Sequence, residues 1–445
     1  MISVEQENGL FHLVESAARA CGVRDVEITL AAGEDALTRF ANNTIHQNVA
    51  ERGVQLSIRS QQDQRTARAS TNRLDRASVE RAVGEAIAMM RASEPLEWLQ
   101  PMTSFSPHRA VERSSPNECG PRERALQVKE AIAIAEESSQ TAAGIFSVSR
   151  ALELIRNTNG ASARHEQTMA TFSITVMDAD SSGWAKRSSV DARDLDTAGL
   201  ARAASRKAAL SRNPLELAPG SYTVVLEPAA VLDLVGQIFP DFSATSLEDK
   251  RSFLTDRLGA QLFGENVNIH DDCTHPLQSG APFDGEGVPR QTIALVERGV
   301  PKDICYSRDS AAKAGKTPTG HGLPLPNEIG EFPANIVIAG GESSIDDMVR
   351  SIDRGIWVTR VWYIREVDPY QKIMTGMTRD GTFLVEKGEV VCGVRNFRLN
   401  QGLVEMLNHV EMLGPAVRAS GEESFDMVVP AMKVRDFNFT EVTRF

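Results

Sequence analysis

The apolar positions near the start of the chain follow two different periods. Within residues 4–21 and again within residues 76–92, apolar residues recur every three or four positions, which predicts amphipathic helices. The first stripe consists of Leu10, Phe11, Val14, Ala17, Ala18 and Cys21, and the second of Val79, Ala82, Val83, Ala86 and Ile87. Between these helices, Val54, Leu56 and Ile58 alternate with Gln55, Ser57 and Arg59, as in a half-buried strand. We therefore expect a helix, an antiparallel sheet and a second helix.

A second block repeats this order of patterns after residues 99–121, which are rich in Pro and Ser, show no period and are interpreted as a linker. A helix is expected at about 122–138 and another at 194–210. Between them, Asn159-Gly160 is typical of a hairpin turn, and Phe172, Ile174 and Val176 alternate. The two blocks together indicate an internal duplication. The alternative is that unrelated α+β domains look alike at this level of detail.

From Gly220 onward, short strand-like runs separated by Gly and Pro turns predominate. In this part Thr378–Gly381 is expected to form a hairpin tip and residues 400–412 a helix. The fold class predicted for the whole chain is α+β. Three domains are expected: an N-terminal α+β domain (1–105), a central α+β domain that repeats the first (106–218) and a C-terminal β-rich domain (219–445).

Composition and charge narrow the functional classes. The 445 residues include 48 Lys and Arg against 60 Asp and Glu, for a net charge of −12, which argues against a non-specific nucleic-acid binder. No apolar run approaches the roughly 20 residues that a membrane span needs, and the first residues, MISVEQENGL, lack the regions of a signal peptide. The cysteines are few, scattered and odd in number, which fits a reduced cytoplasm. They are Cys21, Cys119, Cys273, Cys305 and Cys392.

Several short motifs occur in one order along almost the whole chain. They are Phe40–His46 (FANNTIH), Ser221–Pro228 (SYTVVLEP), Ser252–Leu254 with Leu258-Gly259, Pro282–Pro289 (PFDGEGVP), Thr375–Phe383 (TGMTRDGTF) and Val394–Arg398 (VRNFR). Taken together, this set resembles the TldD/PmbA family. The resemblance implies an N-terminal α+β part, a β-rich C-terminal part and a cytoplasmic zinc metallopeptidase system. That system acts on unfolded or leader-bearing peptides, including microcin precursors and antitoxins, and its members were once called modulators of DNA gyrase.

The resemblance also implies two kinds of subunit. TldD-like chains carry His-Glu-x-x-x-His on the helix after the Val-Val-Leu strand and a distal Cys as third zinc ligand. Two imidazoles and a thiolate leave zinc a position for water, and the Glu acts as general base. PmbA chains, also called TldE, lack these residues and pair with the TldD-like chain.

This chain resembles the PmbA/TldE subunit. The stretch that corresponds to the zinc motif is Gly236–Asp241 (GQIFPD), and the stretch that corresponds to the distal Cys is Gly414–Ser424, which has no Cys. The prediction is therefore no catalytic residue, no metal ligand and no cofactor in this chain. Zinc is expected in a TldD-like partner subunit, with unfolded peptides as substrates and no nucleic-acid or membrane partner. A homodimer is left open as an alternative for the chain alone.

Other residues offer alternative sites. His270, Cys273 and His275 lie within one short segment and would form a non-standard transition-metal site; a polar turn with capping aspartates is the plainer interpretation. Asp284 and Glu286 would form a carboxylate pair, or a turn that fixes the backbone near the domain junction.

Three further residues have weaker patterns. Arg379 would hold a peptide carboxylate if Thr378–Gly381 were more than a hairpin tip. His165, which with Glu166 begins like a metallopeptidase motif, is interpreted as part of a surface turn, and His321 as structural.

Three functional hypotheses follow. The first is a non-catalytic subunit that helps to form the substrate cavity of a metallopeptidase complex. The second is an autonomous metallopeptidase that uses His270, Cys273 and His275. The third is a non-proteolytic peptide-binding homodimer. Metal content separates the first from the second, and co-purification with a TldD-like chain separates the first from the third.

Overall fold

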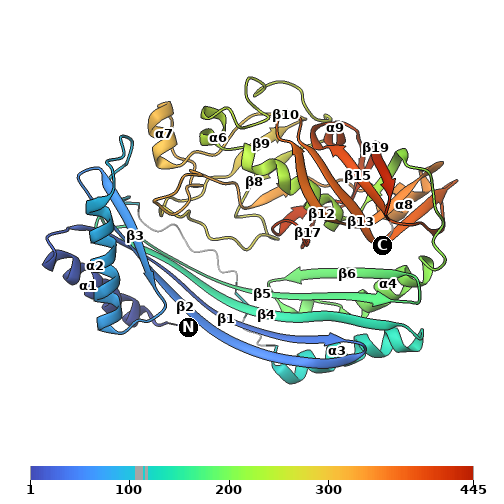
Figure 1. The fold of residues 1–445 in the computed structure, drawn as a ribbon, viewed down its shortest axis with the longest axis horizontal. Helices are drawn as coiled ribbons and strands as arrows, with labels where there is room; N and C mark the ends of the chain where they lie inside the picture. Colours follow the sequence, from blue (N-terminus) through green and yellow to red (C-terminus); the bar gives the residue numbers. More distant parts are fainter. Residues whose placement is uncertain (1, 106–113, 116–118, 444–445) are drawn as a thin grey trace.

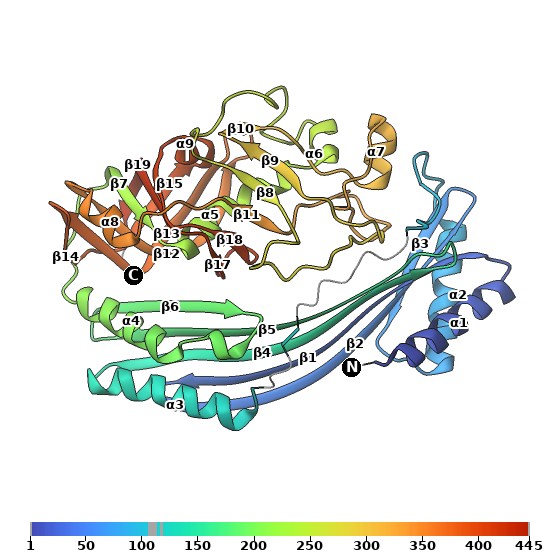
Figure 2. The ribbon, with the colours of Figure 1, turned by 180° about the vertical axis from the view of Figure 1, so that it is seen from behind.

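A computed structural model describes residues 2–105, 114–115 and 119–443. The first half of the chain forms one six-stranded antiparallel sheet (Figures 1 and 2). Its strands are β1 (Asp25–Ala41), β2 (Thr44–Gln62), β3 (Arg65–Thr71), β4 (Thr141–Asn157), β5 (Ser162–Met177) and β6 (Ser182–Ser189), in the order β3-β2-β1-β4-β5-β6. The predicted N-terminal and central blocks therefore join through the β1–β4 pair, in which Glu27–Phe40 runs antiparallel to Gly144–Asn157.

Each block contributes three strands and two long helices in the same order. The helices are α1 (Val4–Ala20) and α2 (Arg76–Ala92) in the first block, and α3 (Pro121–Glu137) and α4 (Thr197–Leu210) in the second. Side chains fix where the first two begin: Ser3 accepts a hydrogen bond from the Gln6 N–H, and Asp75 from the Ser78 N–H. The helix expected at 194–210 starts three residues later, because Ala192–Asp194 forms a separate 3-10 turn.

The two helix pairs cover opposite ends of the same face of the sheet. Leu152 and Leu154 of β4 pack in the core under α1 and α2, whereas Ala142 and Phe146 of the same strand pack in the core with α3 and α4. All four positions are even-numbered and therefore project from one face of the strand. The middle of the sheet, between the two cores, has no helix over it in the described part of the chain (Figure 2).

The C-terminal half contains two further sheets. The first has the order β10-β9-β8-β11-β18-β17 and consists of β8 (Ile269–Asp271), β9 (Ile293–Glu297), β10 (Val300–Pro301), β11 (Ile336–Ile338), β17 (Val417–Ala419) and β18 (Met427–Val429). The second contains β7 (Gly220–Leu226), β12 (Arg354–Asp368), β13 (Ile373–Glu386), β14 (Glu389–Gly393), β15 (Phe397–Gly402), β16 (Val410–Leu413) and β19 (Met432–Val442). Because β13 pairs with both β15 and β12, the path β12-β7-β19-β15-β13 closes on itself.

Short helices connect these strands around the largest apolar core of the described residues. They are α5 (Pro228–Val235), the 3-10 helix η2 (Gly236–Asp241), α6 (Ala244–Glu248), α7 (Arg308–Ala314), α8 (Ile345–Arg350) and α9 (Leu403–Asn408). No helix of the described residues is long and apolar enough to cross a membrane. The predicted α+β class, with a β-rich C-terminal part, is confirmed.

Two predictions for the C-terminal half are wrong. Thr378–Gly381 is not a hairpin tip but lies inside the long strand β13, where Asp380 and Gly381 have φ of 52° and 128° and the register with β12 shifts. The turn-like composition marks a bulge that the neighbouring strand stabilises. Residues 400–412 form the end of β15, the short helix α9 and most of β16, because backbone pairing with β13 and β19 outweighs the helical pattern.

The C-terminal half lies over the face of the sheet opposite α1 and α2 (Figure 1). Arg68 of β3 donates from Nε to the Leu325 carbonyl at 2.7 Å, and Lys186 of β6 donates to the Gly421 carbonyl at 2.6 Å. Beneath this contact, Arg59 is fully buried and forms a two-bond ion pair with Glu27, to which Arg68 adds a third bond at 3.0 Å. Charged side chains thus fix the position of the two halves relative to each other.

Candidate functional site

The first candidate site is the start of α5, where the resemblance would place a zinc-binding helix. Val224–Leu226 of β7 are fully buried, and Glu227 and Pro228 then turn the chain into α5, with Pro at the first helical position. The Glu227 carboxylate does not cap this helix but forms an ion pair with Lys207 of α4 at 2.7 Å. Glu227 is therefore part of the contact between the two halves of the molecule.

Asp233 is the one acidic residue of α5, and it is completely buried. Its Oδ1 accepts hydrogen bonds from the backbone N–H groups of Glu422, Glu423 and Ser424, at 3.1, 2.9 and 3.1 Å. Burial raises the pKa of Asp233 to about 6, although the Glu423 and Glu422 amides favour its charged form. Asp233 therefore binds the 422–424 loop to the helix.

The packing around this contact is close. A Cβ at Gly421 would overlap the Asp233 carboxylate, and a Cβ at Gly236 would overlap the Ser424 hydroxyl. Phe239 of η2 packs edge-on against Phe425 with ring centroids 6.4 Å apart. The stretches that correspond to the two parts of the zinc site therefore meet in space, but backbone amides and aromatic rings fill the junction.

The residues at this junction do not fit a catalytic zinc ion. Such a site needs three His, Cys or carboxylate ligands and an open position for water. The side chains here are Asp233, already bound to three amides, and Asp241, whose carboxylate lies 2.5 Å from the Lys372 ammonium. Burial raises the pKa of Asp241 to about 6. Within residues 2–105, 114–115 and 119–443, no three His, Cys, Asp or Glu side chains are grouped so as to hold a metal.

The polar side chains of the segment His270–His275 make separate contacts and do not converge on one point. Cys273 is buried, and burial raises the pKa of its thiol, which disfavours the thiolate that binds metals. Asp272 accepts from the Thr274 N–H and hydroxyl, and the His275 ring accepts from the Leu277 N–H at 3.2 Å. The capping aspartate expected in a polar turn is therefore present.

Asp271, in the same segment, forms a buried pair with His321 that the sequence did not indicate. Asp271 Oδ1 lies 3.1 Å from His321 Nε2, and both side chains are inaccessible to solvent. Burial alone would raise the pKa of Asp271, but its contact with His321 and the His321 charge hold that pKa below its usual value. The other carboxylate oxygen accepts the Asn335 N–H at 2.8 Å, so the pair joins the end of β8 to two separate loops.

Asp284 and Glu286 are both buried near the junction of the two halves. Asp284 accepts from the N–H groups of Glu286, Val288 and Gly322 at 2.7–2.9 Å and thereby fixes a tight loop. Glu286 accepts the Arg308 N–H at 3.0 Å through Oε1, while its Oε2 is buried without a hydrogen-bond partner. Burial and the nearby Asp284 charge raise the pKa of Glu286 to about 8, so it is a neutral acid at pH 7.

A cavity of about 550 Å³ lies beside this loop, between the sheet and the C-terminal half. Its polar lining consists of Thr29, Gln55, Ser57, Arg68 and Glu153 from the sheet and Asp284, Arg290 and Asn335 from the C-terminal half. Of Asp284, Glu286 and Arg379, for which the sequence offered a binding or catalytic role, only Asp284 lines this cavity.

Arg379 lies elsewhere. Its guanidinium is 4.9 Å from the centre of the Trp362 ring, on the bulge of β13, and its Nε is 3.5 Å from Asp380. Asp380 also forms a buried ion pair with Arg360 and accepts the Ser182 hydroxyl at 2.6 Å. The bulge therefore serves to connect β13, β12 and β6, and its acidic residue pairs with arginines of the same chain.

His165 is not part of a surface turn, as the sequence suggested. It lies within β5 with 2% of its surface exposed, and its Nε2 is 3.0 Å from the Ser279 carbonyl of the C-terminal half. The strand pattern around it was recognisable, but the cover over this face comes from residues more than a hundred positions away, which no local pattern reveals.

These features define an α+β protein with a β-rich C-terminal part, in which the junction after strand β7 is filled by structural contacts. The chain belongs to the PmbA/TldD family: models of the PmbA/TldA metallopeptidase domain 1, central domain and C-terminal domain match residues 26–90, 121–212 and 219–441. The fold is shared with the crystal structure of TldE from Thermococcus kodakarensis, with a TM-score of 0.85 and 21% identity over 98% of this chain and 100% of that one.

Two curated relatives show partial sequence similarity. An uncharacterized protein of Methanocaldococcus jannaschii is 38% identical over 133 residues, which is 28% of this chain and 30% of the relative. Metalloprotease PmbA of Escherichia coli O157:H7 is 25% identical over 247 residues, or 54% of this chain and 52% of the relative. The chain thus aligns with between about a third and a half of the length of these relatives.

Proposed function

We propose that this chain is a non-catalytic subunit of a peptidase complex in the cytoplasm. It pairs with a zinc-bearing TldD-like subunit and forms part of the cavity that receives unfolded or leader-bearing peptides. The observation that carries the proposal is the Asp233 junction, where a carboxylate bound to three backbone amides lies at the position expected for a zinc site.

The chemistry of that junction supports a scaffold role. A peptidase zinc ion needs an exchangeable water and a general base beside it. Here α5 is buried from Ala230 to Val235, and the only acid in it has its Oδ1 bound to the 422–424 loop. All three ligands that the TldD-like motif supplies are replaced together, by Gly236–Asp241 and by Gly414–Ser424. The zinc and the hydrolysis are accordingly assigned to the partner.

The test compares this chain alone with the chain co-expressed with the TldD-like subunit of its source organism. Zinc per chain is measured by plasma mass spectrometry after dialysis without chelator, and hydrolysis is followed on β-casein, an unfolded substrate. We expect near zero zinc and no hydrolysis for this chain alone, and about one zinc per pair with hydrolysis for the complex.

The opposite result would identify the alternative site. About one zinc in the isolated chain together with hydrolysis, both lost in His270→Asn or Cys273→Ser but kept in the exposed control His12→Asn, would establish an autonomous metallopeptidase. Failure of the two subunits to co-purify would favour the peptide-binding homodimer instead.

A further inference from the structure

Part of β2 forms an open edge of the sheet. The strand pairs with β1 along its length, but β3 pairs only with Leu56–Gln62 (Figure 1). The register with β1 is regular from Gln47 onward, so we define the open edge as Gln47–Gln55. Across residues 2–105, 114–115 and 119–443, no backbone group pairs with the outer side of this segment.

Most of the sequence features that protect an edge strand are missing from this segment. Native proteins block such edges with Pro, Lys or bulges, because a row of unpaired N–H and C=O groups is a template for another strand. The open edge contains neither Pro nor Lys, and its only charged residues are Glu51 and Arg52, of opposite sign. Arg52 forms an ion pair with Glu34 of β1 at 3.1 Å, which leaves the edge backbone uncovered.

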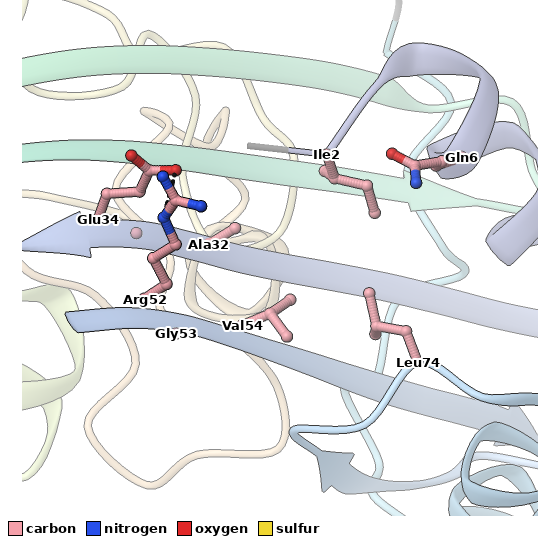
Figure 3. A pocket seen from close by; sticks show the side chains of 9 residues that line it. Ile2, Gln6, Ala32, Glu34, Arg52, Gly53, Val54 and Leu74 are labelled. Carbon is pink, nitrogen blue, oxygen red and sulfur yellow. Dashed lines mark ion pairs between the residues drawn. The ribbon is translucent and has the colours of Figure 1, made fainter.

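Hollows lie on both faces of the sheet beside this edge. On the face of α1, a cavity of about 320 Å³ is lined by Ile2, Ala32, Val54 and Leu74, with Gln6, Glu34 and Arg52 at its polar side (Figure 3). On the other face, a cavity of about 750 Å³ is lined by Gly33, Gly53, Gln55, Ser70, Asn72 and Glu153, among others.

A pair of glycines produces this arrangement. Gly33 of β1 and Gly53 of β2 lie opposite each other in the ladder, and a Cβ at Gly53 would meet no atom within 4 Å. Neither glycine places a side chain on the face opposite α1, where the nearest side-chain group to a Cβ at Gly33 would be the Asp35 carboxylate at 3.6 Å. On the face of α1, Ile2 and Leu74 extend into the hollow from two sides, as Figure 3 shows.

We propose that the open edge binds an extended peptide segment, which adds a strand beside β2 in continuation of β3 and places an apolar side chain against Ile2, Val54 and Leu74. Successive side chains of a strand point to opposite faces, so one added strand would enter both hollows. Backbone hydrogen bonds then give sequence-tolerant affinity, and the apolar hollow favours a residue such as leucine. This inference deepens the proposed function, on which it rests for the identity of the ligand as an unfolded substrate.

A second copy of this chain fits the edge less well. Two β2 edges related by a two-fold axis would pair antiparallel, with opposing residues on the same face. In a register that pairs five or more residues of the open edge, the residue opposite Val54 would be Asn48, Ala50 or Arg52. These side chains are polar or small and would leave the apolar hollow of Ile2 and Leu74 unfilled.

The test uses the full chain alone and a fluorescein-labelled peptide of alternating leucine and threonine with lysine at each end. Binding is measured by fluorescence anisotropy. Two further peptides carry backbone N-methyl groups on alternate residues. In each of these peptides the N-methyl groups lie on only one of the two hydrogen-bonding edges of the extended peptide, and the two peptides differ in which edge is blocked. We expect the unmodified peptide to bind, and N-methylation of one edge to weaken binding at least about tenfold, because it removes the donors that face β2.

Variants locate the site. Gly53→Phe fills the hollow opposite α1 and suits a strand, so we expect it to fold and to weaken binding about tenfold or more. The control Gly9→Phe places the same side chain on the exposed face of α1, where a Cβ also meets nothing within 4 Å. Hydrogen exchange followed by mass spectrometry should show new protection in peptides that cover residues 47–55.

Three results would overturn the proposal. The first is that the anisotropy of the peptide does not change up to about 1 mM protein. The second is that the peptide binds but neither Gly53→Phe nor N-methylation alters its affinity. The third is that the amides of residues 47–55 are protected from exchange without peptide and lose this protection when the protein is diluted. The last would show that a second copy occupies the edge. The binding test is made without a partner subunit. Failure of the hydrolysis assay with the co-expressed pair would therefore refute the proposed function, but it would not affect the outcome of the binding test.

Discussion

The buried acid Glu286 gives the sharpest prediction, because it and the neighbouring Asp284 tie the pH dependence of stability to one buried loop. The pKa of Glu286 is raised from 4.5 to about 8 by burial and by Asp284. Between these values the folded protein keeps a proton that the unfolded chain releases. The free energy of unfolding must therefore fall as pH rises through this window, by about 1.4 kcal/mol per pH unit.

The variant Glu286→Gln removes the titration and keeps an oxygen that accepts the Arg308 N–H. Any change in packing that the substitution causes is independent of pH. From pH 5 to pH 8, the free energy of unfolding of the wild type should therefore fall by about 4 kcal/mol relative to the variant. Below the ordinary value of 4.5 the difference should be constant, since both states are then protonated.

The measurement is urea unfolding followed by tryptophan fluorescence at pH 5, 6, 7, 8 and 9. Glu328→Gln, at an exposed position in a nearby loop, is the matched control and should give a difference from the wild type that does not depend on pH. A difference between Glu286→Gln and the wild type that changes by less than about 1 kcal/mol over this range would refute the assignment of Glu286 as a neutral acid.

Further predictions concern the packed junctions. Asp233→Ala leaves three partly buried amides without their acceptor and removes a fully buried carboxylate, so it should lower the free energy of unfolding by about 2–4 kcal/mol, measured as the urea midpoint at constant slope; an unchanged midpoint would contradict the packed junction. Gly144→Ala places a Cβ against the Ser173 carbonyl and 2.7 Å from the Phe40 ring, so the melting temperature should fall, whereas Gly84→Ala, whose Cβ meets nothing, should not lower it. Phe172→Ala should cost about 3–5 kcal/mol, because this side chain is fully buried, and a loss below about 1 kcal/mol would contradict its place in that core.

The sequence predicted the helices of the first half well, because their apolar stripes and their caps agree. The stripe of residues 76–92 and the Asp75 cap define the same element, α2. The bulge at Asp380 was misinterpreted, since a turn-like composition looks the same at a hairpin tip and inside a strand. What distinguishes the two cases is the ion pair with Arg360, twenty residues away, and the pairing with β12.

The candidate site was predictable only in part. The absence of His at Gly236–Asp241 could be recognised from the motif order, but the role of Asp233 depends on the 422–424 loop, about 190 positions later. Likewise, the pairs Asp271–His321 and Glu27–Arg59 bring together residues of different strands and loops. A single acid inside an apolar helix is the local signal by which the sequence could have singled out Asp233.

The shared sheet of the first half has a practical consequence for dissecting the protein. Glu27–Phe40 of β1 is held between β2 on one side and β4 on the other. A fragment that ends near residue 105 would expose the backbone edge of β1 that pairs with β4 in the whole chain. A fragment that begins near residue 106 would expose the backbone edge of β4 that pairs with β1. Shortened versions for crystallisation or labelling should therefore keep residues 25–189 intact, because a cut in the intervening segment yields two fragments prone to co-aggregation.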